Sequence, residues 1–169
     1  MAKLIHFWYP VLVGMLLGLM QTGLFLQLSF TLSSSFGTFL MVTLSWLVGS
    51  AIGVYALSHK PLKLFLVVSL AGYGGINLLL VLFPFRTEWW PLYALIVVLI
   101  GLYPGVFFGR MGQYYPARVL FFRENNGFIV GLVVGTLLFM LYGRGVFWGL
   151  PLVMAIALST IPEGILGRH

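Results

Sequence analysis

The sequence predicts an all-α integral membrane protein, a six-transmembrane-helix bundle with both termini cytoplasmic. Three observations lead to this prediction. Hydrophobic residues make up 61% of the 169-residue chain, charged residues only 7%, and the mean hydropathy is +1.08. A typical soluble domain is about 25% charged, so the natural solvent of this chain is a bilayer. The apolar residues also fall into long charge-free runs, and the basic residues collect between these runs, mostly on one side.

The apolar runs are long enough to cross a bilayer, which takes roughly 17–25 helical residues. They lack the apolar–polar alternation of a membrane barrel, and the need for internal hydrogen bonding in lipid then leaves helices. The fifth run is short, and its helix can begin inside the preceding loop. All six belong to one predicted transmembrane domain, residues 1–169. The predicted spans are Phe7–Phe30, Gly37–Leu57, Leu64–Phe85, Pro91–Phe108, Gly127–Tyr142 and Val146–Leu166.

The first run follows Lys3 and in this respect resembles a signal sequence. It is longer than the usual apolar region of about 7–15 residues, and no small-residue cleavage site follows it. We therefore expect this segment to be retained as a span. Aromatic residues support the boundaries of several runs, because Trp and Tyr collect at headgroup depth. These residues are Trp8, Tyr9, Trp89, Trp90, Tyr114, Tyr115 and Trp148.

Lysine and arginine predict the orientation, because they are enriched in cytoplasmic loops. Only Arg86 and Arg144 fall on the predicted external side. The other seven fall on the opposite side: Lys3, Lys60, Lys63, Arg110, Arg118, Arg123 and Arg168. This asymmetry places both termini in the cytoplasm and is typical of a bacterial cytoplasmic (inner) membrane. We therefore attribute the net charge of +6 to basic residues that determine the orientation and contact anionic lipid. We expect no nucleic-acid partner.

Glycine recurs at every fourth residue in four of the predicted helices, which places each set along one side of its helix. Such stripes let two backbones approach closely in lipid. We predict that the fourth and fifth helices pack on each other through their glycines, as a hairpin joined by the basic loop Met111–Asn126. Within that loop, Tyr114–Glu124 is expected to lie along the interface as a short helix. The predicted packing residues are Gly14, Gly18, Gly49, Gly53, Gly101, Gly105, Gly109, Gly127, Gly131 and Gly135.

The chain has three acidic residues, which leaves little for catalysis. Glu88 and Glu124 fall in predicted loops, and we expect both to be solvated surface charges. Glu163 falls near the cytoplasmic end of the sixth span. An ionisable group at membrane depth is a functional candidate, although a side chain that reaches the interface near Arg168 is the simpler interpretation.

Histidine and cysteine chemistry is also restricted. The chain has no cysteine, and His6, His59 and His169 fall at predicted cytoplasmic edges, too shallow to ligate a haem inside the bundle. The sequence contains no metal-spaced cluster, nucleophile triad or phosphate-binding loop. We expect no enzymatic activity, no catalytic site, no metal site and no cofactor, while a bound lipid, quinone or pigment stays open.

A few neutral polar residues fall inside the spans. Gln21 lies near the middle of the first, and Tyr73 and Asn77 lie deep in the third. Interhelical hydrogen bonds are the ordinary role of such groups. The sharper interpretation is that these three residues line a cavity for a neutral or amphipathic ligand. On the basic side, Arg110, Arg118 and Arg123 are expected to contact lipid or a partner.

Four short stretches resemble a known family. The end of the second span, Gly49-Ser50-Ala51-Ile52-Gly53, and the turn Lys60-Pro61-Leu62-Lys63 resemble the second helix and following loop of major-facilitator-like bundles. More specifically, they resemble the membrane domain that accompanies some bacterial spermidine synthase-like proteins. Pro104-Gly105-Val106-Phe107-Phe108-Gly109 and Asn125-Asn126-Gly127-Phe128-Ile129-Val130-Gly131 are similar to that domain's fourth and fifth helices.

The resemblance implies a six-helix, half-transporter-like fold. That family tends to carry an acidic and a basic residue in its first helix, where this chain has Gln21 and Gln27. We expect no aminopropyltransferase domain after these helices and therefore no polyamine synthesis activity.

Three functions are compatible with this sequence. The expected one is a non-enzymatic polytopic membrane subunit that packs by glycine-lined helices with other subunits, or with copies of itself, in a larger assembly. The alternative is a small permease or facilitator of a neutral or amphipathic solute, acting alone or as a homodimer of six-helix halves. An integral membrane enzyme acting on lipids or isoprenoids is the third, and the basic loop, with arginines but no histidine, favours it least.

Overall fold

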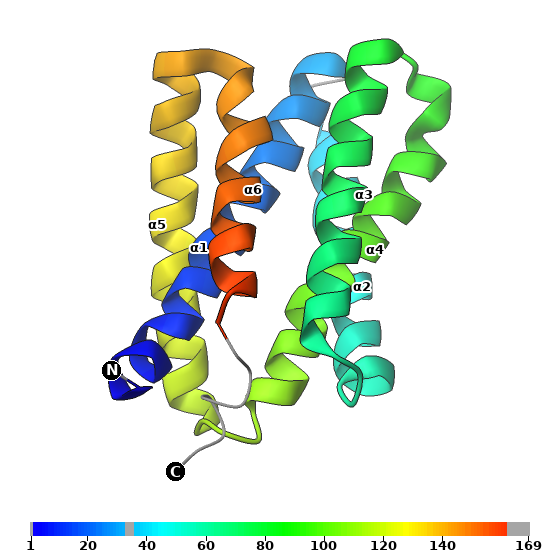
Figure 1. The fold of residues 1–169 in the computed structure, drawn as a ribbon. Helices are drawn as coiled ribbons and strands as arrows, with labels where there is room; N and C mark the ends of the chain where they lie inside the picture. The colour runs from blue at the N-terminus through cyan, green and yellow to red at the C-terminus, as the bar shows by residue number, and fades with distance from the viewer. Residues whose placement is uncertain (1, 33–35, 162–169) are drawn as a thin grey trace. The chain divides into compact units, whose positions relative to one another are not determined.

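The computed structural model describes residues 2–32 and 36–161, and its ribbon is drawn in Figure 1. In this part of the chain the regular structure is entirely helical, which confirms the predicted all-α class. Two short 3₁₀ turns, η1 (Thr87–Trp89) and η2 (Gly143–Gly145), precede the fourth and sixth α-helices. The α-helices are α1 (Ala2–Thr31), α2 (Phe36–Leu57), α3 (Leu62–Leu82), α4 (Trp90–Met111), α5 (Ala117–Tyr142) and α6 (Val146–Ser159).

Five helical stretches in the described residues are long and apolar enough to cross a membrane. Four correspond to α1, α2, α3 and α4, and the fifth, Ala117–Ser159, contains α5, η2 and α6 together. Large apolar side chains also cover much of the surface, as Tyr55 (90% exposed) and Met140 (75% exposed) illustrate. These helices indicate a membrane-embedded protein that contacts lipid.

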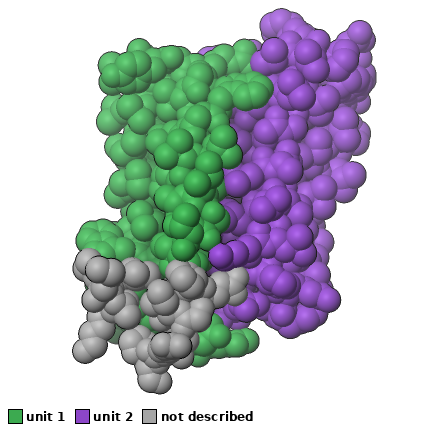
Figure 2. All heavy atoms as spheres, viewed as in Figure 1, with its two compact units in different colours: residues 1–22, 111–169 green, residues 23–110 purple. Residues whose placement is uncertain are grey.

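The chain forms two compact units, coloured separately in Figure 2. Unit 1 contains residues 1–22 and 111–169, so it is built from the first part of α1 together with α5 and α6. Unit 2 contains residues 23–110, which are the last part of α1 and helices α2, α3 and α4. Helix α1 therefore contributes to both units.

Unit 1 is held together by close contact between α1 and α5. A Cβ atom added at Gly14 or Gly18 would collide with the backbone of Glu124 or Phe128, and one added at Gly127 or Gly131 would collide with the backbone of α1. Further along α5, Gly135 faces the side chains of Leu19 and Phe147. Each glycine thus removes a side chain that would keep the two helices apart.

Unit 2 contains a second close contact, between α2 and α4. Here the glycines face each other: a Cβ at Gly49 would lie 2.9 Å from the Cα of Gly101, and one at Gly105 would lie 2.8 Å from the Cα of Gly53. The Ser50 hydroxyl donates a hydrogen bond to the Gly101 carbonyl oxygen (3.2 Å) across the same contact. Backbone contact and a hydrogen bond therefore hold α2 and α4 together.

The main departure from the predicted boundaries lies in the basic loop. Helix α5 begins at Ala117, so residues 117–126 belong to it and do not form a separate interfacial helix. The charges of Arg118, Arg123 and Glu124 excluded these residues from a purely apolar span, but a helix can continue beyond the hydrocarbon into the headgroups. Pro116 precedes the first helical residue with φ −56°, a position that suits proline because it lacks an N–H.

Candidate functional site

The two glycine ladders of the predicted hairpin pack on other helices than expected. Gly101, Gly105 and Gly109 of α4 face α2, and Gly109 also lies against Ser58, the residue just after α2. Gly127 and Gly131 of α5 face α1. The prediction that α4 and α5 pack on each other through these residues is wrong, because each stripe is already filled inside its own unit. The spacing identified the contact side of each helix but not its partner.

A cluster of buried polar side chains lies in unit 2, between the last turns of α1 and the second half of α3. Gln27 is 1% exposed, Asn77 is 2% exposed and Tyr73 is 4% exposed. The carboxamides of Gln27 and Asn77 are both neighbours of the Tyr73 hydroxyl. These three side chains form what we call the polar cluster.

The polar cluster is incompletely hydrogen-bonded. Asn77 Nδ2 donates to the backbone carbonyl of Tyr73, one turn earlier in α3, at 2.9 Å. Among the described residues, however, neither the Tyr73 hydroxyl nor either polar atom of the Gln27 carboxamide has a partner in hydrogen-bonding geometry. Burying such a group without a partner costs roughly 2–7 kcal/mol. The cluster thus presents donors and acceptors without formal charge.

Other polar residues of unit 2 do act as interhelical links. The Ser69 hydroxyl of α3 donates to the Ile100 carbonyl oxygen of α4 at 2.9 Å, and both groups are buried. Ser50 links α2 to α4 in the same way. Hydrogen bonding between helices therefore explains these two serines, but it does not explain Gln27 or Tyr73.

Gln21 was predicted to join Tyr73 and Asn77. It is half-buried and belongs to unit 1, and the residue of α1 that adjoins Tyr73 is Gln27. The positions of the polar residues relative to the helix ends could have identified Gln27. Gln27 lies four residues before the end of α1 and Asn77 five residues before the end of α3, and the two helices end on the same side because α2 connects them antiparallel.

The basic residues of the connection between α4 and α5 fall into two groups. Arg110 donates a hydrogen bond to the Lys60 carbonyl oxygen at 2.9 Å and so joins the end of α4 to the turn after α2. Arg118 and Arg123 instead line a groove in unit 1 together with Phe7, Val119 and Phe122. The guanidinium carbon of Arg123 lies 4.3 Å from the centre of the Phe7 ring, a cation–π contact.

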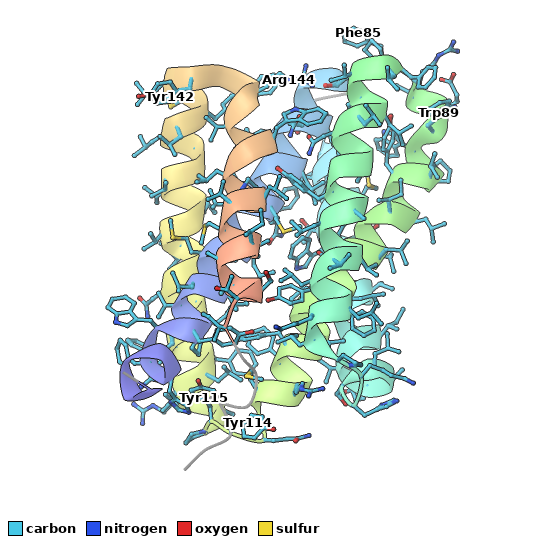
Figure 3. All side chains as sticks on the ribbon, viewed as in Figure 1. Phe85, Trp89, Tyr114, Tyr115, Tyr142 and Arg144 are labelled. Atoms are coloured by element: carbon cyan, nitrogen blue, oxygen red, sulfur yellow. The ribbon has the colours of Figure 1, made fainter. Side chains whose placement is uncertain are left out.

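A second contact fixes the start of α1 beside this groove. The Tyr115 hydroxyl donates to the His6 carbonyl oxygen at 2.8 Å, and the two rings stack with centroids 4.1 Å apart. Burial raises the pKa of Tyr115 to about 12, and the nearby Arg123 charge offsets part of that rise. Figure 3 shows Tyr115 at the opposite end of α5 from Tyr142 and Arg144.

The acidic residues differ from expectation in one case. Glu88 is exposed and pairs with Arg86 at 3.0 Å, as a surface charge would. Glu124, by contrast, lies inside α5, is only 8% exposed, and places its backbone against Gly14. It is therefore not a solvated loop charge. Glu163 lies outside the described residues.

The remaining candidates give no cluster for catalysis or metal binding. His6 is stacked on Tyr115 and His59 is exposed, and His169 lies outside the described residues. In the part of the chain that the structure describes, no three His, Cys, Asp or Glu side chains gather in a group that could hold a metal ion.

Comparison with protein-family models, curated proteins and solved structures gives no match to this chain. The resemblance to the membrane domain of spermidine synthase-like proteins therefore stays a prediction, and the function has to be argued from the geometry of this chain alone.

Proposed function

We propose that this chain is a non-enzymatic membrane facilitator that binds a small neutral solute at the polar cluster of unit 2. The observation that carries the proposal is the Gln27 carboxamide. Gln27 is 1% exposed, and although the Tyr73 hydroxyl is its neighbour, neither of its polar atoms has a partner in hydrogen-bonding geometry among the described residues. A polar solute that donates to and accepts from this carboxamide would remove the energetic penalty of its burial.

The chemistry of the cluster favours a neutral solute. A carboxamide and a phenol can each donate and accept hydrogen bonds, and none of the three cluster residues carries a charge at neutral pH. The sequence also resembles a family that tends to carry an acidic and a basic residue in its first helix. In this chain the neutral residues Gln21 and Gln27 occupy that helix. A charged solute would need a counter-charge at this depth, because bare charges are costly in the membrane.

The proposed topology is six crossings with both termini cytoplasmic, in a bacterial cytoplasmic membrane. Supporting it are the six α-helices found in the described part of the chain and the excess of Lys and Arg on the side of the N-terminus. In this orientation the polar cluster lies in the outer half of the membrane, since Gln27 and Asn77 fall near the ends of α1 and α3 that are remote from the N-terminus.

The test is solute flux through proteoliposomes that contain the full chain, measured by stopped-flow light scattering with glycerol and urea as probes. We expect faster equilibration than in empty liposomes. Gln27→Leu and Asn77→Leu should each slow it by up to about tenfold, the effect of losing one neutral hydrogen bond of about 0.5–1.5 kcal/mol. Equal rates in proteoliposomes and empty liposomes would refute facilitation of these probes.

Asn126→Leu is the matched control. Asn126 and Asn77 both donate Nδ2 to the carbonyl one turn earlier in their helix, to Phe122 at 2.6 Å and to Tyr73 at 2.9 Å respectively. Asn126 is exposed, however, and Asn77 is buried. Loss of flux in Asn77→Leu with none in Asn126→Leu would assign the effect to the cluster. Equal loss in both would point to a general effect on helix stability.

A second function, as a subunit that packs in a larger membrane assembly, is favoured by the surface of α5 and α6. Only 11% of the most apolar stretch in Ala117–Ser159 is buried, against 67% for α1. Such a surface suits contact with other transmembrane helices as well as with lipid. Purification in mild detergent followed by mass spectrometry separates the two functions: foreign subunits that co-purify support the assembly, while the chain alone or a homodimer supports the facilitator.

A further inference from the structure

The groove of unit 1 combines two arginines with an apolar wall. It has a volume of about 490 Å³ and is lined by Phe7 of α1 and by Arg118, Val119, Phe122 and Arg123 of α5. All four α5 residues lie within the first seven residues of that helix. The polar cluster has no part in this groove.

The two arginines are available to an anion. Neither forms an ion pair or hydrogen bond with another described residue; Arg123 has instead its cation–π contact with Phe7. The neighbouring carboxyl group, on Glu124, is not among the lining residues and belongs to a buried side chain. A guanidinium group binds phosphate through two parallel hydrogen bonds, so two of them form a strong phosphate site.

The apolar part of the groove indicates what carries the phosphate. Phe7 and Phe122 are 45% and 70% exposed, and rings exposed to this degree beside arginines would give no advantage for a free inorganic ion. Trp8, whose ring contacts that of Phe7, and Tyr114, three residues before α5, are also exposed, at 48% and 41%. Aromatic residues of this kind gather at the level of lipid headgroups.

We infer that this groove binds the headgroup of an anionic phospholipid, with the phosphate between Arg118 and Arg123 and the first acyl carbons against Phe7 and Phe122. Because Phe7 belongs to α1 and the other residues to α5, a lipid seated here would contact both helices of the glycine-packed pair of unit 1. The inference is independent of the solute proposed for unit 2.

The test uses the full chain in detergent, titrated with phosphatidylglycerol and, separately, with phosphatidylcholine, with bound lipid counted by native mass spectrometry. We expect phosphatidylglycerol to bind at least about tenfold more tightly. Arg118→Gln and Arg123→Gln should each reduce its affinity by about 10- to 150-fold, which corresponds to the loss of a charge-assisted hydrogen bond of about 1.5–3 kcal/mol. Arg118→Lys, which keeps the charge, should reduce it less.

Arg144→Gln is the matched control, since Arg144 lies at the other end of α5 (Figure 3) and outside the groove. Unchanged affinity in this variant, with loss in Arg118→Gln, supports the site. Equal loss in all three variants would show that net charge alone attracts the lipid and would overturn the inference. Equal binding of the two lipids would overturn it as well.

Two further outcomes identify the occupant. Displacement of phosphatidylglycerol by equimolar inorganic phosphate would mean that the groove binds a free anion, and it would overturn the lipid assignment. A photoreactive residue in place of Phe122 should cross-link to lipid in membranes. Cross-linking to a protein instead would assign the groove to a partner. If Arg123→Gln fails to fold, Arg118→Gln and Arg118→Lys still decide the result, because Arg118 has no contact that supports the fold among those described.

Discussion

The two helix pairs that pack through glycine, α1–α5 in unit 1 and α2–α4 in unit 2, carry the same four-residue spacing but use it differently. In α2–α4, glycine faces glycine at two successive levels, and the contact is sealed by the Ser50 hydrogen bond. In α1–α5, four glycines face the backbone of a larger residue, such as Glu124 or Met15, and Gly135 faces side chains. Side chains therefore flank the α1–α5 contact, and at its basic end they form the groove.

This difference shows that a glycine stripe has two separable roles. Where two stripes meet, as in α2–α4, the atoms nearest Gly49, Gly53, Gly101 and Gly105 are backbone atoms of the other helix, and the Cα of a facing glycine is among them. Opposite larger residues, a glycine stripe brings functional side chains of one helix close to the other, as with Phe7 and Arg123. The first pair is suited to a rigid frame, and the second is suited to a binding surface.

The largest expected effect comes from filling the glycine-on-glycine contact. In Gly105→Ala the new Cβ would lie 2.8 Å from the Cα of Gly53, and only a shift of whole helices could relieve the clash. We expect a loss of about 3 kcal/mol in unfolding free energy, the upper end of the usual range for overpacking. Denaturation in mixed detergent micelles would measure it.

Two other glycines complete the series. In Gly135→Ala the new Cβ would meet only the side chains of Leu19 at 3.0 Å and Phe147 at 3.3 Å, which can shift, so we expect about 1 kcal/mol. Gly75→Ala places its Cβ within 4 Å of nothing and should be neutral or slightly stabilising. If Gly105→Ala were as mild as Gly75→Ala, backbone contact would not hold α2 against α4.

The next largest effect concerns the buried serine link in unit 2. Ser69→Ala removes the 2.9 Å hydrogen bond to the Ile100 carbonyl oxygen. We expect a loss of about 0.6–1.7 kcal/mol, as for other hydrogen bonds between helices in membranes. Thr136→Val is the control, because the half-buried Thr136 makes an exposed hydrogen bond to the Leu132 carbonyl of its own helix. A similar loss in both variants would mean that the interhelical bond adds nothing.

A smaller effect separates the arginines of the basic connection. Arg110→Gln removes the hydrogen bond to the Lys60 carbonyl, which is exposed, and should lower the unfolding free energy by about 0.5–1 kcal/mol. Arg118→Gln should leave it unchanged in lipid-free detergent while reducing affinity for anionic lipid. The reverse pattern, with Arg118 the stabilising residue, would contradict the division of these residues into a structural and a ligand-binding group.

Much of the fold could be predicted from hydropathy alone, because a bilayer requires long apolar helices and this chain supplies them. The helix partners could not be predicted. Four-residue spacing of Gly101 and Gly127 gives the contact side of each helix, but the identity of the opposing helix depends on how every helix packs. The position of Glu124 was also predicted wrongly. A charged residue marks the end of a predicted apolar span, so Glu124 was assigned to a loop, whereas α5 extends beyond the apolar span and begins at Ala117.

The candidate site was predicted in part. Tyr73 and Asn77 are brought together with a glutamine of α1, as a neutral cavity would require, but that glutamine is Gln27. The distances of Gln27 and Asn77 from the ends of their helices would have predicted that these two residues lie at a similar depth. The prediction used the middle of the apolar run instead, which is where Gln21 lies. The groove was foreseen only through its arginines. Its apolar half, Phe7 and Phe122, could not be recognised among the 15 phenylalanines of the chain.

The smallest effect is a pH dependence confined to unit 1. Burial raises the pKa of Tyr115 from 10 to about 12, so the folded protein holds this proton more tightly than the unfolded chain does. The resulting stabilisation is fully present below pH 10 and is lost as the pH rises from 10 to 12.

Tyr115→Phe lacks both the proton and the hydrogen bond to His6. It should therefore be less stable than the wild-type protein at pH 8, and the difference should shrink as the pH approaches 12. Thermal denaturation at pH 8 and pH 11.5 would measure this convergence, with Tyr114→Phe, at an exposed position, as the control that stays parallel to the wild type. The absence of any gap between Tyr115→Phe and the wild type at pH 8 would mean that the contact between Tyr115 and His6 acts through ring stacking and not through the hydroxyl. A gap of constant size from pH 8 to pH 11.5 would contradict the predicted pH dependence.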